Sequence, residues 1–144
     1  EYLSETFLEQ QGWSGHQKKK AAARSVCAEL HGDFSYFKTQ WPMNCHLHQA
    51  RKPDQQLDRE IARLDAILYC CQRKYGDGGN YLFGNFSIAD AFMAPFAIAL
   101  DCYKAELTHK SRDYVQYLLG HVHVQSWLDD AQKELDSVRF ARTG

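Results

Sequence analysis

The chain has 144 residues, 17 of them basic and 18 acidic, so its formal net charge is −1 at pH 7. This balance argues against nucleic acid or an anionic membrane surface as the main partner. Hydrophobic residues make up 44% of the chain without a run long enough to cross a bilayer, which predicts one globular domain and no membrane span.

The first periodic segment covers residues 23–41. Apolar side chains recur there at intervals of three and four, which is the spacing of a single helix face: Ala23, Val26, Cys27, Leu30, Phe34, Phe37 and Trp41. Pro42 predicts the end of this helix, because proline disfavours a helical conformation in the residue before it. Residues 42–53 are predicted as a loop, and Asp54 as the N-cap of the next helix.

The helix after Asp54 has the clearest periodicity in the chain. Its apolar face consists of Leu57, Ile61, Leu64, Ile67, Leu68, Cys71 and Tyr75. The glycine-rich segment 76–80 predicts the end of this helix and a flexible connection to the next element.

Residues 81–90, Tyr-Leu-Phe-Gly-Asn-Phe-Ser-Ile-Ala-Asp, are the most informative segment of the chain. Gly84 and Asn85 predict a turn. Ser87 is a suitable N-cap, and Asp90 stands three residues later, so the two predict a capping box with aspartate in place of the usual glutamate. The spacing favours this structural role over acid–base chemistry for Asp90.

The helix that Ser87 opens is predicted to run to residue 105. It is apolar on all sides from Ala91 to Leu100, which predicts complete burial, and Pro95 inside it predicts a kink. Another helix is predicted from Thr108 or Ser111 to Leu119, ended by Gly120.

The last predicted helix has its apolar face at Val124, Trp127, Leu128, Ala131 and Leu135. Residues 136–144 show no pattern and are predicted to be mobile or to lie across the surface. No strand-like alternation is sustained anywhere, so the predicted fold class is all-α, a five-helix bundle around the helix 87–105.

The spacing of the histidines and cysteines argues against a metal site or a reactive thiol. Cys45, His46 and His48 could ligate a metal, but no second pair of ligands is evident, and His121 and His123 would point apart on a helix. A polar loop without metal is therefore favoured. Cys70 and Cys71 lie on a periodic helix, which is typical of buried structural cysteines. Five cysteines without framework spacing indicate reduced thiols and a cytoplasmic protein.

The segment from Tyr81 to Ala91 resembles the start of the buried central helix in the C-terminal domain of cytosolic glutathione transferases. Residues 24–34 resemble the first long helix of that domain in bacterial members, and residues 42–44 resemble the loop after it. Residues 126–131 resemble the helix that ends its core. The similarity covers residues 1–135, with the matching segments in the same order.

This resemblance implies a domain organisation. Residues 1–15 would be the end of a thioredoxin-like domain and the linker after it, 16–135 the helical domain and 136–144 a tail. The thioredoxin-like domain of the family holds glutathione and the residue that activates it. No catalytic residue is therefore expected in this chain.

The resemblance also implies a substrate pocket. In the family, the first helix of the domain borders the site for the electrophilic substrate, which makes Glu29, His31, Phe34, Met43 and Asn44 candidate pocket residues. Helical spacing alone predicts a surface histidine and a core phenylalanine instead.

The implied protein is a glutathione transferase that conjugates glutathione, its co-substrate, to hydrophobic electrophiles without a metal. A homodimer built on the first two helices is expected, with neither nucleic acid nor membrane as partner. Isomerisation or peroxide reduction with glutathione is a further possibility within the family. The alternative is a stand-alone protein-interaction module of the same fold without catalysis.

Overall fold

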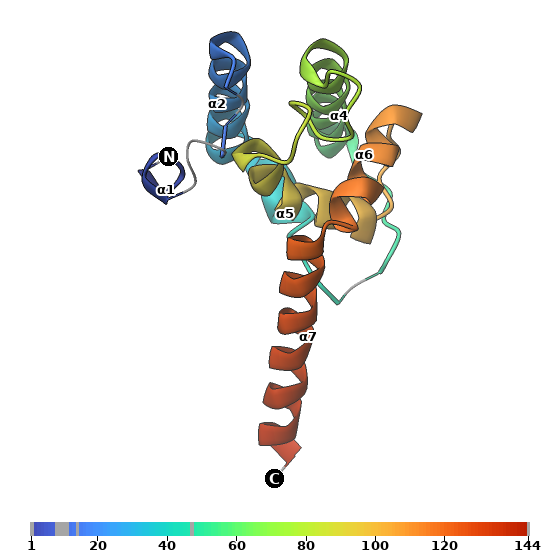
Figure 1. Ribbon diagram of the computed structural model, residues 1–144. Coiled ribbons are helices and arrows are strands. Elements are labelled where there is room, and N and C mark those ends of the chain that lie inside the picture. The colour runs from blue at the N-terminus through green and yellow to red at the C-terminus, as the bar shows by residue number, and fades with distance from the viewer. Residues whose placement is uncertain (1, 8–11, 14, 47, 144) are drawn as a thin grey trace.

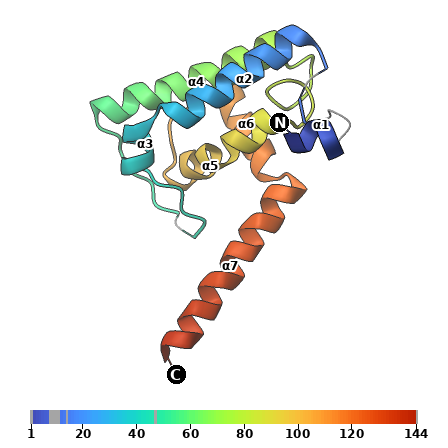
Figure 2. The ribbon, with the colours of Figure 1, turned by 90° about the vertical axis from the view of Figure 1, so that its left-hand side faces the viewer.

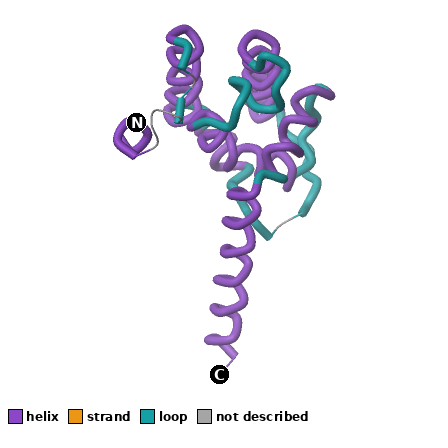
Figure 3. Tube along the Cα trace, viewed as in Figure 1, coloured by secondary structure: helices purple, strands orange, loops and turns teal. Residues whose placement is uncertain are grey.

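The computed structural model describes residues 2–7, 12–13, 15–46 and 48–143, and this part of the chain is all-α (Figure 1). Figure 3 shows helices joined by loops, without a strand among the described residues. Two more helices are present there than the five expected. The helices are α1 (Tyr2–Phe7), α2 (Gln17–Gly32), α3 (Ser35–Gln40), α4 (Gln55–Tyr75), α5 (Ile88–Cys102), α6 (His109–Leu119) and α7 (Val122–Thr143).

Helix α5 lies at the centre of the fold. It packs against α2 and α6, while α3 and α6 both pack against α4. Figure 2 shows α2 and α4 above α5 and α6, and Figure 1 shows that α2 and α4 stand apart from each other. Helix α7 packs against α6 and then leads away from the other helices in both views (Figures 1 and 2).

One hydrophobic core joins these helices. Its least accessible aliphatic side chains come from α2, α4, α5 and α6 and from the segment before α5: Leu30, Leu64, Leu68, Leu82, Met93, Leu100 and Leu118. Burial of such side chains contributes about 1.5–3 kcal/mol each, so this core is the main source of stability. None of the described helices is both long and apolar enough to cross a membrane.

The predicted helix 23–41 is in fact two helices. Helix α2 ends at Gly32, and Phe34 adopts a left-handed conformation with φ of 60° before α3 begins. The side chain of Phe34 is nonetheless buried, and its ring contacts Phe96 at a centroid distance of 5.7 Å. The carboxylate of Glu60 accepts a 2.7 Å hydrogen bond from the Phe37 N–H, which satisfies a free donor in the first turn of α3.

The expectation that α5 is buried on all sides is also wrong. Ala91, Phe92 and Pro95 are exposed, while Met93, Ala97 and Leu100 are buried. The apolar pattern is continuous around α5, but the other described helices do not cover this side of it. Helix α5 also ends at Cys102, three residues earlier than predicted.

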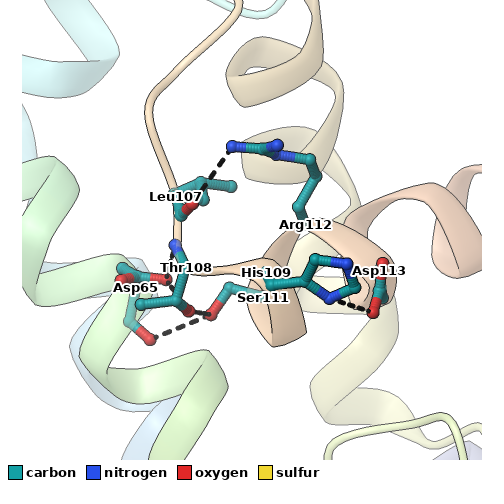
Figure 4. Close-up of polar contacts among 7 residues, drawn as sticks. All are labelled: Asp65, Leu107, Thr108, His109, Ser111, Arg112 and Asp113. Carbon is teal, nitrogen blue, oxygen red and sulfur yellow. Dashed lines mark hydrogen bonds and ion pairs between the residues drawn. The ribbon is translucent and has the colours of Figure 1, made fainter.

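The start of α6 is anchored to α4 by a polar cluster (Figure 4). The Asp65 carboxylate accepts hydrogen bonds from the N–H and the hydroxyl of Thr108, at 3.2 and 2.9 Å. Thr108 precedes α6 and its hydroxyl lies 3.0 Å from that of Ser111. Helix α6 then runs to Leu119 with Gly120 as its C-cap, as predicted.

Helix α7 is longer than predicted. Its backbone remains helical to Thr143, so the helix includes residues 136–143, for which the sequence predicted only a tail without a pattern. Neither glycine nor proline occurs between residues 122 and 143, so the sequence contains no strong signal that would end this helix earlier.

Candidate functional site

An open apolar groove of about 300 Å³ lies where α2, α3 and α5 meet. Its mouth carries large exposed side chains, with Met43 at 40% and Phe92 at 42% of their full exposure. Exposed apolar side chains that line the same groove can mark a binding site. The residues that line the groove are Leu30, His31, Phe37, Lys38, Met43, Phe92, Pro95 and Phe96.

Aromatic rings form the base of the groove. Phe96 of α5 is stacked with Phe37 of α3 at a centroid distance of 5.6 Å, and its ring meets the edge of Phe34. These contacts join Phe96 of α5 to the start of α3. The groove therefore has a rigid apolar base that suits a flat hydrophobic ligand.

Lys38 brings the one ammonium group among the groove residues. Its Nζ donates to the carbonyls of His31 and Asp33, at 2.9 and 2.7 Å, and lies 5.7 Å from the centre of the Phe96 ring. The ammonium group thus satisfies free carbonyls at the end of α2. It also places a positive charge over the aromatic base of the groove.

The five pocket residues expected from the sequence are placed differently from one another. His31 and Met43 line the groove. Phe34 does not line it, but its ring packs against the groove residue Phe96. Glu29 accepts two hydrogen bonds from Arg63 of α4 instead. The Asn44 side chain accepts from the His46 N–H at 2.9 Å and is not among the groove residues.

Sequence reasoning missed Phe92, Pro95 and Lys38 as groove residues. Phe92 and Pro95 belong to a helix that reads as apolar on every side, so nothing in the pattern marks the face that stays exposed. Lys38 lies within a stretch predicted as one helix with α2. Only the break at Phe34 turns α3 so that Lys38 reaches the end of α2.

The capping box before α5 is present, and its aspartate does more than cap. Asp90 is fully buried, and its Oδ2 accepts from the N–H and the hydroxyl of Ser87 at 2.9 and 2.8 Å. Its Oδ1 accepts from the Leu82 N–H at 3.1 Å and from the Tyr114 hydroxyl at 3.0 Å. Burial raises the pKa of Asp90 more than these hydrogen bonds lower it.

The thiols do not form a nucleophilic site in the described part of the chain. Burial raises the pKa of Cys27 to about 11 and that of Cys71 to about 12, so both are protonated thiols at neutral pH. Burial also raises the pKa values of Cys45 and Cys102. Cys70 is exposed on α4, away from the groove residues.

The histidines are arranged differently from the expectation. His121 lies in the turn before α7 rather than on a helix with His123, and the two rings are 5.2 Å apart. Even so, the described residues contain no group of three His, Cys, Asp or Glu side chains that could hold a metal ion.

A larger hollow of about 760 Å³ lies between the start of α4 and the loop after α5. Its charged residues are of both signs: Arg51, Lys52, Asp54, Asp58, Lys104 and Glu106. Asp54 is committed to structure there, because it caps α4 through the Leu57 N–H at 2.9 Å and accepts from the Tyr36 hydroxyl at 2.6 Å. The apolar groove, which brings the exposed Met43 and Phe92 together with aromatic rings, is the better candidate for binding.

A scan of protein-family models gives no match to this chain, and a search of curated proteins gives no significant match. The function therefore has to be inferred from the groove itself. Its residues include one imidazole but no thiol, hydroxyl or carboxylate. This arrangement can bind a hydrophobic molecule, and a reactive group would have to come from the ligand or from elsewhere in the protein.

Proposed function

We propose that this chain is the helical domain of a glutathione transferase and contributes the binding groove for a hydrophobic electrophile. The observation that carries the proposal is the apolar groove between α2, α3 and α5, where His31 and Met43 meet an aromatic base. The capping box that opens α5 adds local support, because the sequence around it carries the family resemblance.

The proposal assigns different tasks to different parts of the protein. The groove would hold the electrophile by apolar burial against Phe92 and Phe96. Glutathione, the co-substrate, would be bound and activated by a thioredoxin-like domain outside residues 16–135. Helices α2 and α4 would supply a homodimer interface, which sedimentation of the native protein can test.

The experiment uses the longest native form of the protein. Retention on immobilised glutathione and turnover of chlorodinitrobenzene with glutathione are expected. Met43→Ser and Phe92→Ser should raise KM for chlorodinitrobenzene about tenfold each, because each removes about 1.4 kcal/mol of apolar contact. KM for glutathione should stay unchanged. Absence of both retention and turnover would refute the proposal.

An interaction module without catalysis is the second candidate, favoured by a separate observation. Helix α7 leads away from the other helices and carries Val122 and Trp127 at 69% and 48% exposure (Figure 1). In that case Trp127→Ser should abolish partner capture while Phe92→Ser leaves it intact. For a transferase, the same Trp127→Ser variant should match the wild type in turnover.

The native mass separates the two candidates further. A native protein that is longer than this 16.6 kDa chain by about 80 residues, the size of a small domain, would favour the transferase. A native mass of 16.6 kDa would favour the interaction module.

A further inference from the structure

Two residues, Gly120 and His121, connect α6 to α7. The N–H of His121 donates to the Leu118 carbonyl at 3.0 Å at the end of α6. The carbonyl of His121 accepts from the Gln125 N–H at 2.9 Å, which is the first helical hydrogen bond of α7. His121 is therefore the N-cap residue of α7, and the direction in which α7 leaves the fold depends on this turn.

The His121 side chain also caps the helix. Its Nδ1 accepts a hydrogen bond from the N–H of His123 at 3.3 Å, which satisfies one of the free donors in the first turn of α7. Because Nδ1 accepts, the proton of the neutral ring is on Nε2. The usual capping residues are Ser, Thr, Asp and Asn, none of which gains or loses a proton between pH 5 and 8 in the ordinary case.

Neighbouring rings hold the His121 imidazole in this orientation. It lies flat on Phe86, with ring centroids 4.0 Å apart and planes 11° apart. Tyr81 meets its edge at a centroid distance of 5.8 Å. The imidazole is thus fixed between the segment before α5 and the start of α7.

Protonation of this ring conflicts with its capping role for two reasons. A proton on Nδ1 removes the acceptor and turns a second donor toward the His123 N–H. It also places a positive charge at the positive end of the helix dipole. We propose that His121 is a pH-sensitive cap, and that its protonation loosens the first turn of α7.

The groups that face His121 differ in whether they favour or oppose the loosening of α7. The ring face of Phe86 attracts a cation and so opposes the loosening. His123 of α7 adds like charge when it is protonated itself. Tyr81 remains neutral across this pH range, because burial raises its pKa, and Tyr117 of α6 contacts Tyr81 rather than stacking on His121.

Two other contacts of α7 do not depend on this proton. The side chain of Gln125 donates to the Leu119 carbonyl, so α6 and α7 remain linked when the cap is lost. Farther along α7, Gln132 Oε1 lies 2.9 Å from His46 Nδ1 in the loop that also carries Met43. The expected change is therefore local fraying of the first turn of α7.

The test follows the backbone amides of the ¹⁵N-labelled protein by NMR from pH 8 to pH 5. The Cα shifts of residues 122–125 should lose helical character, and this loss should follow the titration of the His121 ring. Amides at the centre of α2 serve as an internal reference and should not follow this titration. A His121 ring that titrates without any change at residues 122–125 would overturn the proposal.

Two variants sharpen this result. His121→Asn keeps a neutral capping acceptor, so the Cα shifts of its residues 122–125 should keep their helical character between pH 8 and 5. His123→Gln removes the neighbouring imidazole but keeps the backbone donor, so the wild-type transition should persist. A transition that survives in His121→Asn, or disappears in His123→Gln, would assign the effect to another group and contradict the role of His121.

Discussion

The hydroxyl of Tyr114 donates a 3.0 Å hydrogen bond to Oδ1 of Asp90 and thereby ties α6 to the first turn of α5. Both side chains are fully buried, so neither can exchange this partner for water. The capping box alone joins residues three apart, whereas this contact joins two helices. A local capping motif has become part of the tertiary structure.

Replacing Tyr114 with Phe should therefore lower the free energy of unfolding by about 1–3 kcal/mol, because Asp90 loses a donor in a buried site. Urea unfolding measures the change. Tyr69→Phe on α4, where the side chain is partly exposed, is the matched control and should change stability by less than about 0.5 kcal/mol. Equal losses in the two variants would mean that the Tyr114–Asp90 hydrogen bond contributes nothing specific.

The pH dependence of stability should carry the signature of Asp90. Burial raises its pKa in the folded protein, so between the unfolded and folded pKa values the native state binds the extra proton. The contribution of Asp90 to stability should therefore be fully present at or below pH 4 and fall by up to about 1.4 kcal/mol per pH unit as the pH rises through the folded pKa.

Urea unfolding between pH 4 and 8 tests this sign. Asp90→Asn should remove the Asp90 contribution from the curve, whereas Asp58→Asn at an exposed position of α4 should keep it. If Asp90→Asn has the same pH dependence as the wild type, Asp90 is not the group responsible.

The turn before α5 should be intolerant of side chains at Gly79. A Cβ there would lie 2.4 Å from the Gly84 carbonyl oxygen, and the atom it meets belongs to the backbone of a turn in which Gly84 has a φ of 99°. Gly79→Ala should cost about 1–3 kcal/mol in thermal or urea unfolding, as overpacking typically does. Gly15→Ala, where a Cβ meets open space, should be close to neutral.

The ion pair between Glu29 and Arg63 should contribute far less than the Asp90 site, although its geometry is good. Arg63 donates from Nε and Nη2 to the two carboxylate oxygens, at 2.6 and 2.8 Å. The arginine side chain is 57% exposed, so solvent screens the pair. Arg63→Gln should cost no more than about 1 kcal/mol at low salt.

The loss in Arg63→Gln should shrink further in 1 M NaCl, where the screening length is about 3 Å. Arg59→Gln, which removes the same charge from an exposed position of α4, provides the baseline. A loss that is as large in high salt as in low salt would point to packing of the arginine stem rather than to the ion pair.

Contacts within one turn of the chain could be predicted, and contacts between distant residues could not. The Ser87–Asp90 box and the Asp54 cap are both present, because each depends on residues three apart. The Tyr114 hydroxyl comes from 24 residues farther along the chain, and no local spacing indicates it. The break at Phe34 escaped prediction for a related reason, since α3 continues the apolar spacing of α2 after a change of direction.

The candidate groove could be predicted only in part. His31 and Met43 were expected there from the family resemblance, whereas the exposed face of α5 has no signal of its own. The buried face of a helix can be predicted from the sequence where polar residues mark the face that is exposed to solvent. Helix α5 has apolar residues on both its covered and its uncovered side, so only packing distinguishes them.

The carbonyl of Gly12 accepts a 2.9 Å hydrogen bond from the N–H of Ile88, and the N–H of Gly12 donates to the Ser4 hydroxyl at 3.0 Å. The first of these joins backbone to backbone, across 76 positions of sequence. A side chain at Gly12 would disturb it, because a Cβ there would lie 2.8 Å from Ser4 Cβ and 2.9 Å from Ile88 Cδ1. The start of α5 therefore depends on a glycine 76 positions earlier in the sequence, so this position joins the first described segments of the chain to its central helix.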